Sequence, residues 1–235
     1  MAIDRAKIKD FLVFKGEFAV NFCRGVNVLI GANATGKTTL MKALYAVCNI
    51  SSSTIIREEI LEIHSPFIVK GYFTQILKHI EAEKGLNAVL SVYDNSISKE
   101  PVVNILLDSN LESESISIQA SSSTMLKKWM EKDIKSVFIP EKDLLSNSRG
   151  LPETYEYGNA QYTQCEIDVV KKARVLANRP EQPLYREICD LIGGEPENDG
   201  QNFFIKRRGL EKRIPFSMEA SGYRKFGLLA TLIRN

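Results

Sequence analysis

The sequence predicts an α/β fold with an antiparallel β subdomain at the N-terminus and a helical lobe further along the chain. Three observations support this fold class. Residues 7–22 alternate between apolar and polar side chains, which is typical of half-buried strands. A short apolar run at 26–30 leads into a glycine-containing loop and then an amphipathic helix. After Pro140 the apolar residues recur at helical spacing instead.

The N-terminal elements follow from these patterns. The alternation over Lys7–Lys15 and Phe18–Phe22 predicts two strands, and Lys15-Gly16-Glu17 between them predicts a hairpin turn. Val26–Ile30 is a short, mostly apolar run that ends at a glycine, which predicts a buried strand. Thr38–Cys48 carries apolar residues at helical spacing, which predicts a helix.

The same patterns define the rest of the chain. Further strands are predicted at Asn87–Tyr93, Val102–Leu107, Ser115–Gln119 and Ser136–Ile139. Further helices are predicted at Phe73–Ala82, Met125–Lys132, Gln164–Leu176 and Pro183–Ile192. After a turn-rich break at Gly193–Gly200, a small hairpin is predicted around Arg208-Gly209 from Phe203–Lys206 and Glu211–Phe216. Ser221–Arg234 predicts a final amphipathic helix with Ser221 as its N-cap.

The composition is that of a globular protein in a reducing compartment. Of 235 residues, 44% are apolar and 26% are charged, and 31 basic residues face 29 acidic ones, so net charge favours neither a nucleic-acid nor a membrane partner. The four cysteines form no C-x-x-C pair, and the two histidines complete no metal-ligand spacing. The polar N-terminus lacks the features of a signal peptide, and no apolar run reaches membrane-spanning length. We therefore expect a cytoplasmic protein without a membrane partner.

The loop before the first long helix carries the most specific motif. Gly31-Ala-Asn-Ala-Thr-Gly36-Lys37-Thr38 fits the P-loop pattern G-x-x-x-x-G-K-[ST] without a mismatch. Glycines at 31 and 36 allow the backbone to wrap a triphosphate so that successive N–H groups point inward. The helix that starts near Lys37 directs its positive end at the same phosphates. The motif predicts ATP as the ligand.

Each residue of the motif has a predicted role. Lys37 is the candidate catalytic residue, because its ammonium reaches the β- and γ-phosphates and neutralises charge that develops during transfer. The Thr38 hydroxyl is the candidate ligand of the cofactor Mg²⁺, which bridges the same two phosphates. The predicted phosphate-binding set is Gly31, Asn33, Ala34, Thr35, Gly36, Lys37, Thr38 and Thr39.

The N-terminal third resembles the first lobe of ABC-type ATPases of the SMC and RecF kind. Their opening has two antiparallel strands and then the pattern G-x-N-x-x-x-G-x-N-x-x-G-K-[ST]-T-L. The residues on that pattern here are Gly25, Asn27, Gly31, Asn33, Gly36, Lys37, Thr38, Thr39 and Leu40. The resemblance is to the group of prokaryotic AAA-family ATP-binding proteins with ABC-like cores, near which overcoming-lysogenization-defect nucleases belong. It implies an ATPase module, in DNA maintenance or phage defence.

Two further segments resemble parts of the same family. Glu219–Lys225 is similar to the signature motif, which implies that Ser221 and Gly222 contact the γ-phosphate of ATP held by another subunit, and so an ATP-dependent homodimer. Ser136–Leu145 resembles the loop whose first residue, normally glutamine, touches Mg²⁺ and the attacking water. Glu141 takes the nearest position; a glutamate could orient water or metal, but it adds negative charge beside a triphosphate. The alternative is a solvated glutamate.

The family also has a strand ending in Asp-Glu after the signature helix, and this sequence has no equivalent. Val103–Asp108 is no substitute, because Ser109 follows it and the run precedes the signature. The resemblance thus implies one ABC-type domain, with a core at 1–140, a helical lobe and hairpin at 141–220 and the signature helix at 221–235. We expect it to be the N-terminal part of a longer protein, or completed by a partner chain, and to hydrolyse ATP poorly alone.

Other functions remain open. A module that binds nucleotide without hydrolysing it and recruits a partner is the main alternative. A GTPase is disfavoured because no N-K-x-D motif is present, and a kinase because no acceptor site is recognisable. A basic cluster on the predicted hairpin is either a DNA contact or a solvated surface. It consists of Lys206, Arg207, Arg208, Lys212 and Arg213.

Overall fold

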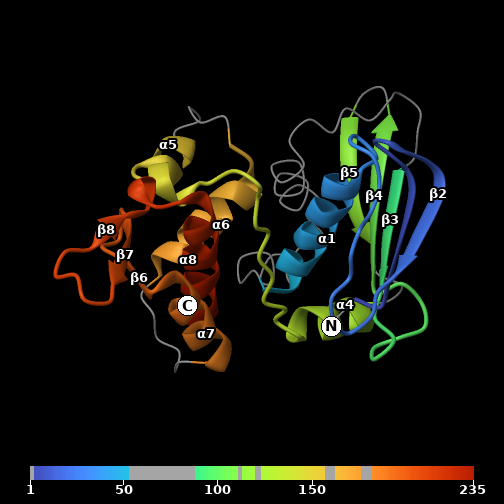
Figure 1. Ribbon diagram of the computed structural model, residues 1–235. Helices are drawn as coiled ribbons and strands as arrows, with labels where there is room; N and C mark the ends of the chain where they lie inside the picture. The colour runs from blue at the N-terminus through green and yellow to red at the C-terminus, as the bar shows by residue number, and fades with distance from the viewer. Residues whose placement is uncertain (1–2, 53–87, 111–112, 120–122, 157–161, 176–181) are drawn as a thin grey trace. The chain divides into compact units, whose positions relative to one another are not determined.

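The computed structural model describes residues 3–52, 88–110, 113–119, 123–156, 162–175 and 182–235 (Figure 1). The chain divides into two compact units, Met1–Ser136 and Val137–Asn235, and each is described by itself. The predicted helix at Phe73–Ala82 lies outside the described residues.

The first unit is built on a five-stranded sheet of order β2-β1-β3-β4-β5, in which every neighbouring pair is antiparallel. Its strands are β1 (Arg5–Phe11), β2 (Phe14–Asn21), β3 (Ala88–Tyr93), β4 (Val103–Asn110) and β5 (Ser113–Gln119). Its helices are α1 (Lys37–Ser52) and α4 (Ser123–Glu131). The antiparallel N-terminal subdomain is therefore present, and most of these elements agree with the sequence patterns.

One face of this sheet forms the core of the unit. Ile8 pairs with Leu90, and Leu90 pairs with Ile105, so the three side chains form a row across β1, β3 and β4. All three are almost fully buried, as period-2 alternation requires for one face of a sheet. Helix α1 covers this face in Figure 1, and the indole of buried Trp129 in α4 donates to the carbonyl of Val47 in α1 at 3.4 Å. This hydrogen bond joins the first helix to α4.

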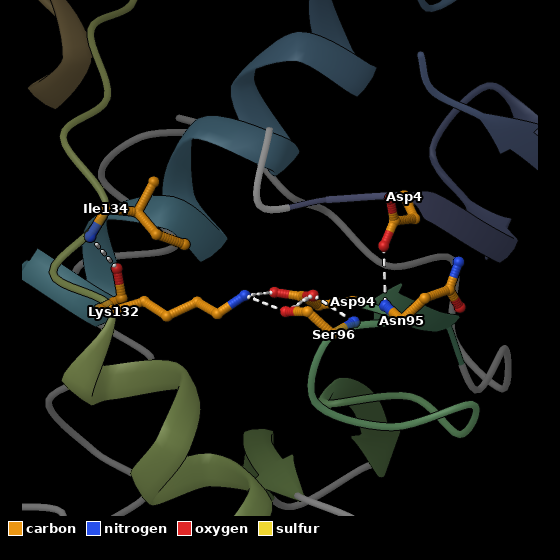
Figure 2. Close-up of polar contacts among 7 residues, drawn as sticks. Asp4, Asp94, Asn95, Ser96, Lys132 and Ile134 are labelled. Atoms are coloured by element: carbon orange, nitrogen blue, oxygen red, sulfur yellow. Dashed lines mark hydrogen bonds and ion pairs between the residues drawn. The ribbon is translucent and has the colours of Figure 1, made fainter. Parts of the chain in front are cut away.

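A polar network holds the end of β3 against the end of α4 (Figure 2). The buried Asp94 carboxylate accepts hydrogen bonds from the backbone N–H of Ser96 at 2.9 Å and its hydroxyl at 2.6 Å, and forms an ion pair with Lys132. Lys132 also donates to the Ser96 hydroxyl at 2.7 Å. On the other side, Asp4 accepts from the backbone N–H of Asn95 at 2.7 Å. Because the buried carboxylate is both paired and hydrogen-bonded, the network stabilises this corner of the unit.

The hairpin turn predicted at 15–17 is wrong. Strand β2 already begins at Phe14. The chain reverses just before it, at residues 12–13, where Leu12 has a left-handed φ of 53°. Gly16 lies inside β2 with a φ of 72°, and its N–H donates to the Asp10 carboxylate at 2.8 Å. The glycine therefore serves an irregularity in the β1–β2 pairing and not the turn itself.

Two predicted strands do not form. Val26, Val28 and Ile30 belong to no strand and are 88%, 74% and 91% exposed, so the predicted buried strand at 26–30 is wrong. The run at 136–139 is likewise unpaired, and its Val137 and Ile139 are exposed. Among the described residues no strand lies beside either run to pair with it. The described sheets are consequently antiparallel throughout.

The second unit combines helices with a three-stranded sheet of order β6-β7-β8. Its helices are α5 (Leu151–Glu156), α6 (Gln164–Arg174), α7 (Pro183–Ile192) and α8 (Ser221–Arg234), with short 3-10 turns η1 (Leu145–Asn147) and η2 (Phe216–Met218). Its strands are β6 (Gly194–Asn198), β7 (Phe203–Arg207) and β8 (Ile214–Pro215). A buried cluster that includes Ile192, Ile205 and Leu228 joins α7, β7 and α8.

Two local predictions change in this unit. The segment predicted as a turn-rich break contains β6, which pairs antiparallel with β7 from Gly194 opposite Arg207. Ser221 is the first residue of α8 and not its cap; Ala220 holds the N-cap position with extended backbone and offers no side-chain hydrogen bond.

A Cβ on Gly227 would lie 2.7 Å from the ring of Phe216, so α8 packs closely on η2.

Candidate functional site

The loop from Gly31 to Gly36 is a tight turn that ends in the first turn of α1. Ala34 has a φ of 63° and Gly36 a φ of 89°, so the chain takes two left-handed positions in quick succession. The first helical hydrogen bond runs from the N–H of Leu40 to the carbonyl of Gly36 at 2.8 Å. The N–H groups at the start of α1 precede this bond and have no partner within the helix. Such a turn presents backbone donors to an anion.

Lys37 folds back over this loop. Its ammonium donates to the carbonyl oxygens of Gly31 at 2.8 Å and Ala32 at 2.5 Å, and lies 3.4 Å from the Thr35 hydroxyl. Thr35 itself donates to the Ala32 carbonyl at 2.9 Å. The charge of the lysine is thus held at the centre of the loop and directed inward, where it can meet an anion.

Both motif glycines lie close to other side chains. A Cβ on Gly31 would lie 2.9 Å from the Thr35 hydroxyl oxygen and 3.9 Å from the Lys37 ammonium. A Cβ on Gly36 would lie 2.5 Å from Val13 and 2.7 Å from the ring of Phe14. The loop therefore packs against the tip of the β1–β2 hairpin, a contact that the sequence does not reveal.

The predicted magnesium ligand is the second residue of α1. Thr38 is exposed and lies directly beyond Lys37, at the end of the helix that faces the loop. Mg²⁺ in nucleotide sites takes one or two protein oxygens together with phosphate oxygens and water, so a single hydroxyl beside the loop fits that chemistry. Among the described residues, no group of three or more histidine, cysteine, aspartate or glutamate side chains gathers to hold a metal alone.

The remaining predicted site residues belong to the second unit. Ser221, Gly222 and Tyr223 form the exposed first turn of α8, whose first backbone bond is from Arg224 to Ala220 at 3.1 Å. Glu141 is exposed and its side chain contacts no predicted site residue of that unit. Its backbone, however, is close to α8. The structure thus brings the Glu141 segment and the predicted signature helix together.

Two cations of α8 form that contact. Lys225 donates to the carbonyl of Pro140 at 3.0 Å and to that of Glu141. Arg224 pairs with Asp143 at 2.5 Å and donates to the Ser146 hydroxyl at 3.0 Å. The sequence motif includes both cations but does not reveal these contacts, because their partners lie about 80 residues away along the chain.

The basic cluster predicted on the hairpin is largely engaged. Arg207 pairs with Glu219, Arg208 pairs with Asp190, and Arg213 lies over the ring of Phe204 with 4.1 Å from its guanidinium carbon to the ring centroid. Hydrogen bonding to Glu219 raises the pKa of Arg207 above its ordinary value. Three of the five cations thus have partners within the unit, whereas Lys206 and Lys212 are exposed.

None of the helices in the described part of the chain combines the length and the apolar character that crossing a bilayer demands.

Comparison with known proteins shows the family of the chain. A model of the AAA domain matches residues 5–153, which is more than half of the chain and includes the P-loop and α1. The match ends before α8, so it does not bear on Ser221 and Gly222. No curated protein matches the chain. The chain belongs to the AAA domain family of nucleotide-binding P-loop ATPases.

Proposed function

We propose that this protein is a module that binds ATP and Mg²⁺ at Gly31–Thr39 and self-associates when it does so. The observation that carries the proposal is the position of Lys37, whose ammonium is held inside the loop by the carbonyls of Gly31 and Ala32. A phosphate entering the loop exchanges these carbonyls for charged oxygens, which are stronger partners for an ammonium.

The residues around the loop have distinct tasks in this proposal. The first N–H groups of α1 and the loop amides bind the phosphate oxygens, and Lys37 neutralises charge on the terminal phosphates. The Thr38 hydroxyl would hold Mg²⁺, which would supply positive charge beside the terminal phosphates. The two glycines keep the backbone close enough for these contacts.

The second part of the proposal concerns α8. Ser221 and Gly222 contact the γ-phosphate held by another copy of the chain, so that two nucleotides are enclosed in an isologous dimer. The open N-terminus of α8 supports this, because its first turn is exposed and lacks a side-chain cap. Exposed apolar side chains surround it, with Met218 78% exposed and Tyr223 and Phe226 partly so. Apolar residues around a polar centre are typical of interfaces.

The experiment is sedimentation of the chain with Mg²⁺ and either ATP or no nucleotide. Wild type is expected to shift from monomer to dimer with ATP. Lys37→Ala is expected to remain monomeric, since it removes the cation that holds the nucleotide. Ser221→Arg is expected to bind ATP as wild type does, yet to raise the concentration for half-association by about tenfold or more, because a long cation intrudes on the contact.

Gln201→Arg is the control, because Gln201 is also exposed but lies in the turn between β6 and β7, outside the proposed contact. It is expected to dimerise as wild type does. A wild-type chain that binds ATP and stays monomeric contradicts the second part of the proposal. Phosphate release in the same samples separates an ATPase from a module that binds ATP without turnover.

A further inference from the structure

The start of α8 is not fixed by its own side chains. Its N-cap residue is Ala220, which has no hydrogen-bonding side chain, and Ser221 is already helical and exposed. The residues leading into it, Glu219 and Ala220, have extended backbone with ψ of 154° and 146°. An uncapped helix end frays readily unless tertiary contacts hold it.

Arg207, the last residue of β7, makes tertiary contacts of this kind. Its guanidinium donates to both carboxylate oxygens of Glu219, at 3.1 Å and 2.6 Å, and to the carbonyl of Ile192 at 2.7 Å. The same group lies over the ring of Tyr223, 4.7 Å from its centroid. One planar cation therefore joins the end of α7, the approach to α8 and the first turn of α8. A bidentate contact of this kind fixes orientation as well as distance.

The pair also sets the charge beside the helix end. Glu219 is buried, with only 8% of its surface exposed, and stands two residues before Ser221. An unpaired carboxylate there would oppose the attraction between the helix N-terminus and an anion. Arg207 cancels that charge at hydrogen-bonding distance, which leaves the N–H groups of α8 free to attract a phosphate.

We infer that Arg207 is a positioning residue, which holds the first turn of α8 in the orientation and charge state that Ser221 and Gly222 need to contact a phosphate. This inference rests on the proposed function. It also gives Arg207 a role other than the DNA contact predicted from the basic cluster of the hairpin.

The test compares ATP-dependent dimerisation of three variants with that of wild type. Arg207→Met is expected to raise the concentration for half-association by about tenfold or more, since Glu219 is left buried and unpaired. Arg207→Lys keeps the charge without the planar fork, so a partial recovery is expected. Nucleotide binding to the monomer is expected to be unchanged, because the P-loop lies in the other unit. Arg208→Met is the matched control, because Arg208 forms an exposed ion pair on the same strand end, and it should dimerise normally.

The results distinguish a failure of the role of Arg207 from a failure of the proposed dimerisation. If wild type dimerises with ATP and Arg207→Met does so equally well, the role of Arg207 is overturned. If Arg207→Met does not fold, Glu219→Gln decides: it keeps an acceptor but weakens the pair, so several-fold weaker dimerisation supports the role and unchanged dimerisation overturns it. If wild type binds ATP without dimerising, the contact proposed for Ser221 and Gly222 fails and the role of Arg207 fails with it.

Discussion

Gly36 is the residue at which the P-loop tolerates substitution least. Its backbone is left-handed, with a φ of 89°, and an added methyl group would clash with Val13 and Phe14 of the β1–β2 hairpin. Gly36 therefore has two independent reasons to be glycine, one from the backbone and one from packing. The P-loop motif predicts the first reason, whereas only the fold supplies the second.

Gly36→Ala is expected to lower the free energy of unfolding by about 2 kcal/mol or more, from left-handed strain and overpacking together. Gly25→Ala is the matched control, because Gly25 has open space around its Cα and no left-handed φ, and it should change stability by less than about 0.5 kcal/mol. Urea unfolding of the two variants measures both effects. Equal stability of the two would contradict the packing of the loop on the hairpin.

At the scale of elements, the helices and antiparallel strands follow closely from sequence. The predicted helix at 183–192 coincides with α7, and the strand predicted at 87–93 coincides with β3 to within one residue. In these elements the apolar residues recur with the period of a helix or a strand. Most of the strands also pair with neighbours close in sequence. The predicted hairpin turn differs from the observed one because Gly16 lies at an irregularity within the β1–β2 pairing and not at the turn.

The apolar runs at 26–30 and 136–139 were predicted as strands, but neither forms one. An apolar run forms a buried strand only where other strands pair with it and helices cover it. The apolar residues of a run indicate that it favours burial. They do not indicate whether another strand is present to pair with it. Within the part of the chain that the structure describes, neither run is paired, and Val26 and Ile30 remain exposed.

The network around Asp94 gives an element-scale prediction. Lys132→Met removes the cation that pairs with a buried carboxylate, so it is expected to lower the free energy of unfolding by about 1–3 kcal/mol. Lys135→Met is the control, since its pair with Asp133 is exposed on both sides and should contribute less than about 0.5 kcal/mol. Thermal unfolding checks both. A Lys132→Met variant as stable as the control would mean that Ser96 alone satisfies Asp94.

At the scale of the whole molecule, the predicted site residues belong to two compact units. The P-loop and Thr38 lie in the first unit, while Glu141, Ser221 and Gly222 lie in the second. The sequence predicts the first group directly, because the residues of the P-loop motif are contiguous in the chain. It does not reveal that Arg207 pairs with Glu219 before α8, or that Asp143 pairs with Arg224 in α8, because these contacts depend on folding.

The central claim is that Lys37, held inside the loop, binds the phosphates of ATP. Calorimetric titration of wild type, Lys37→Ala and the exposed-surface control Lys9→Ala with ATP and Mg²⁺ tests it most directly. We predict that Lys37→Ala raises the dissociation constant by at least about 100-fold, or about 2.7 kcal/mol, and that Lys9→Ala leaves it unchanged. Equal affinity of Lys37→Ala and wild type for ATP would contradict the claim.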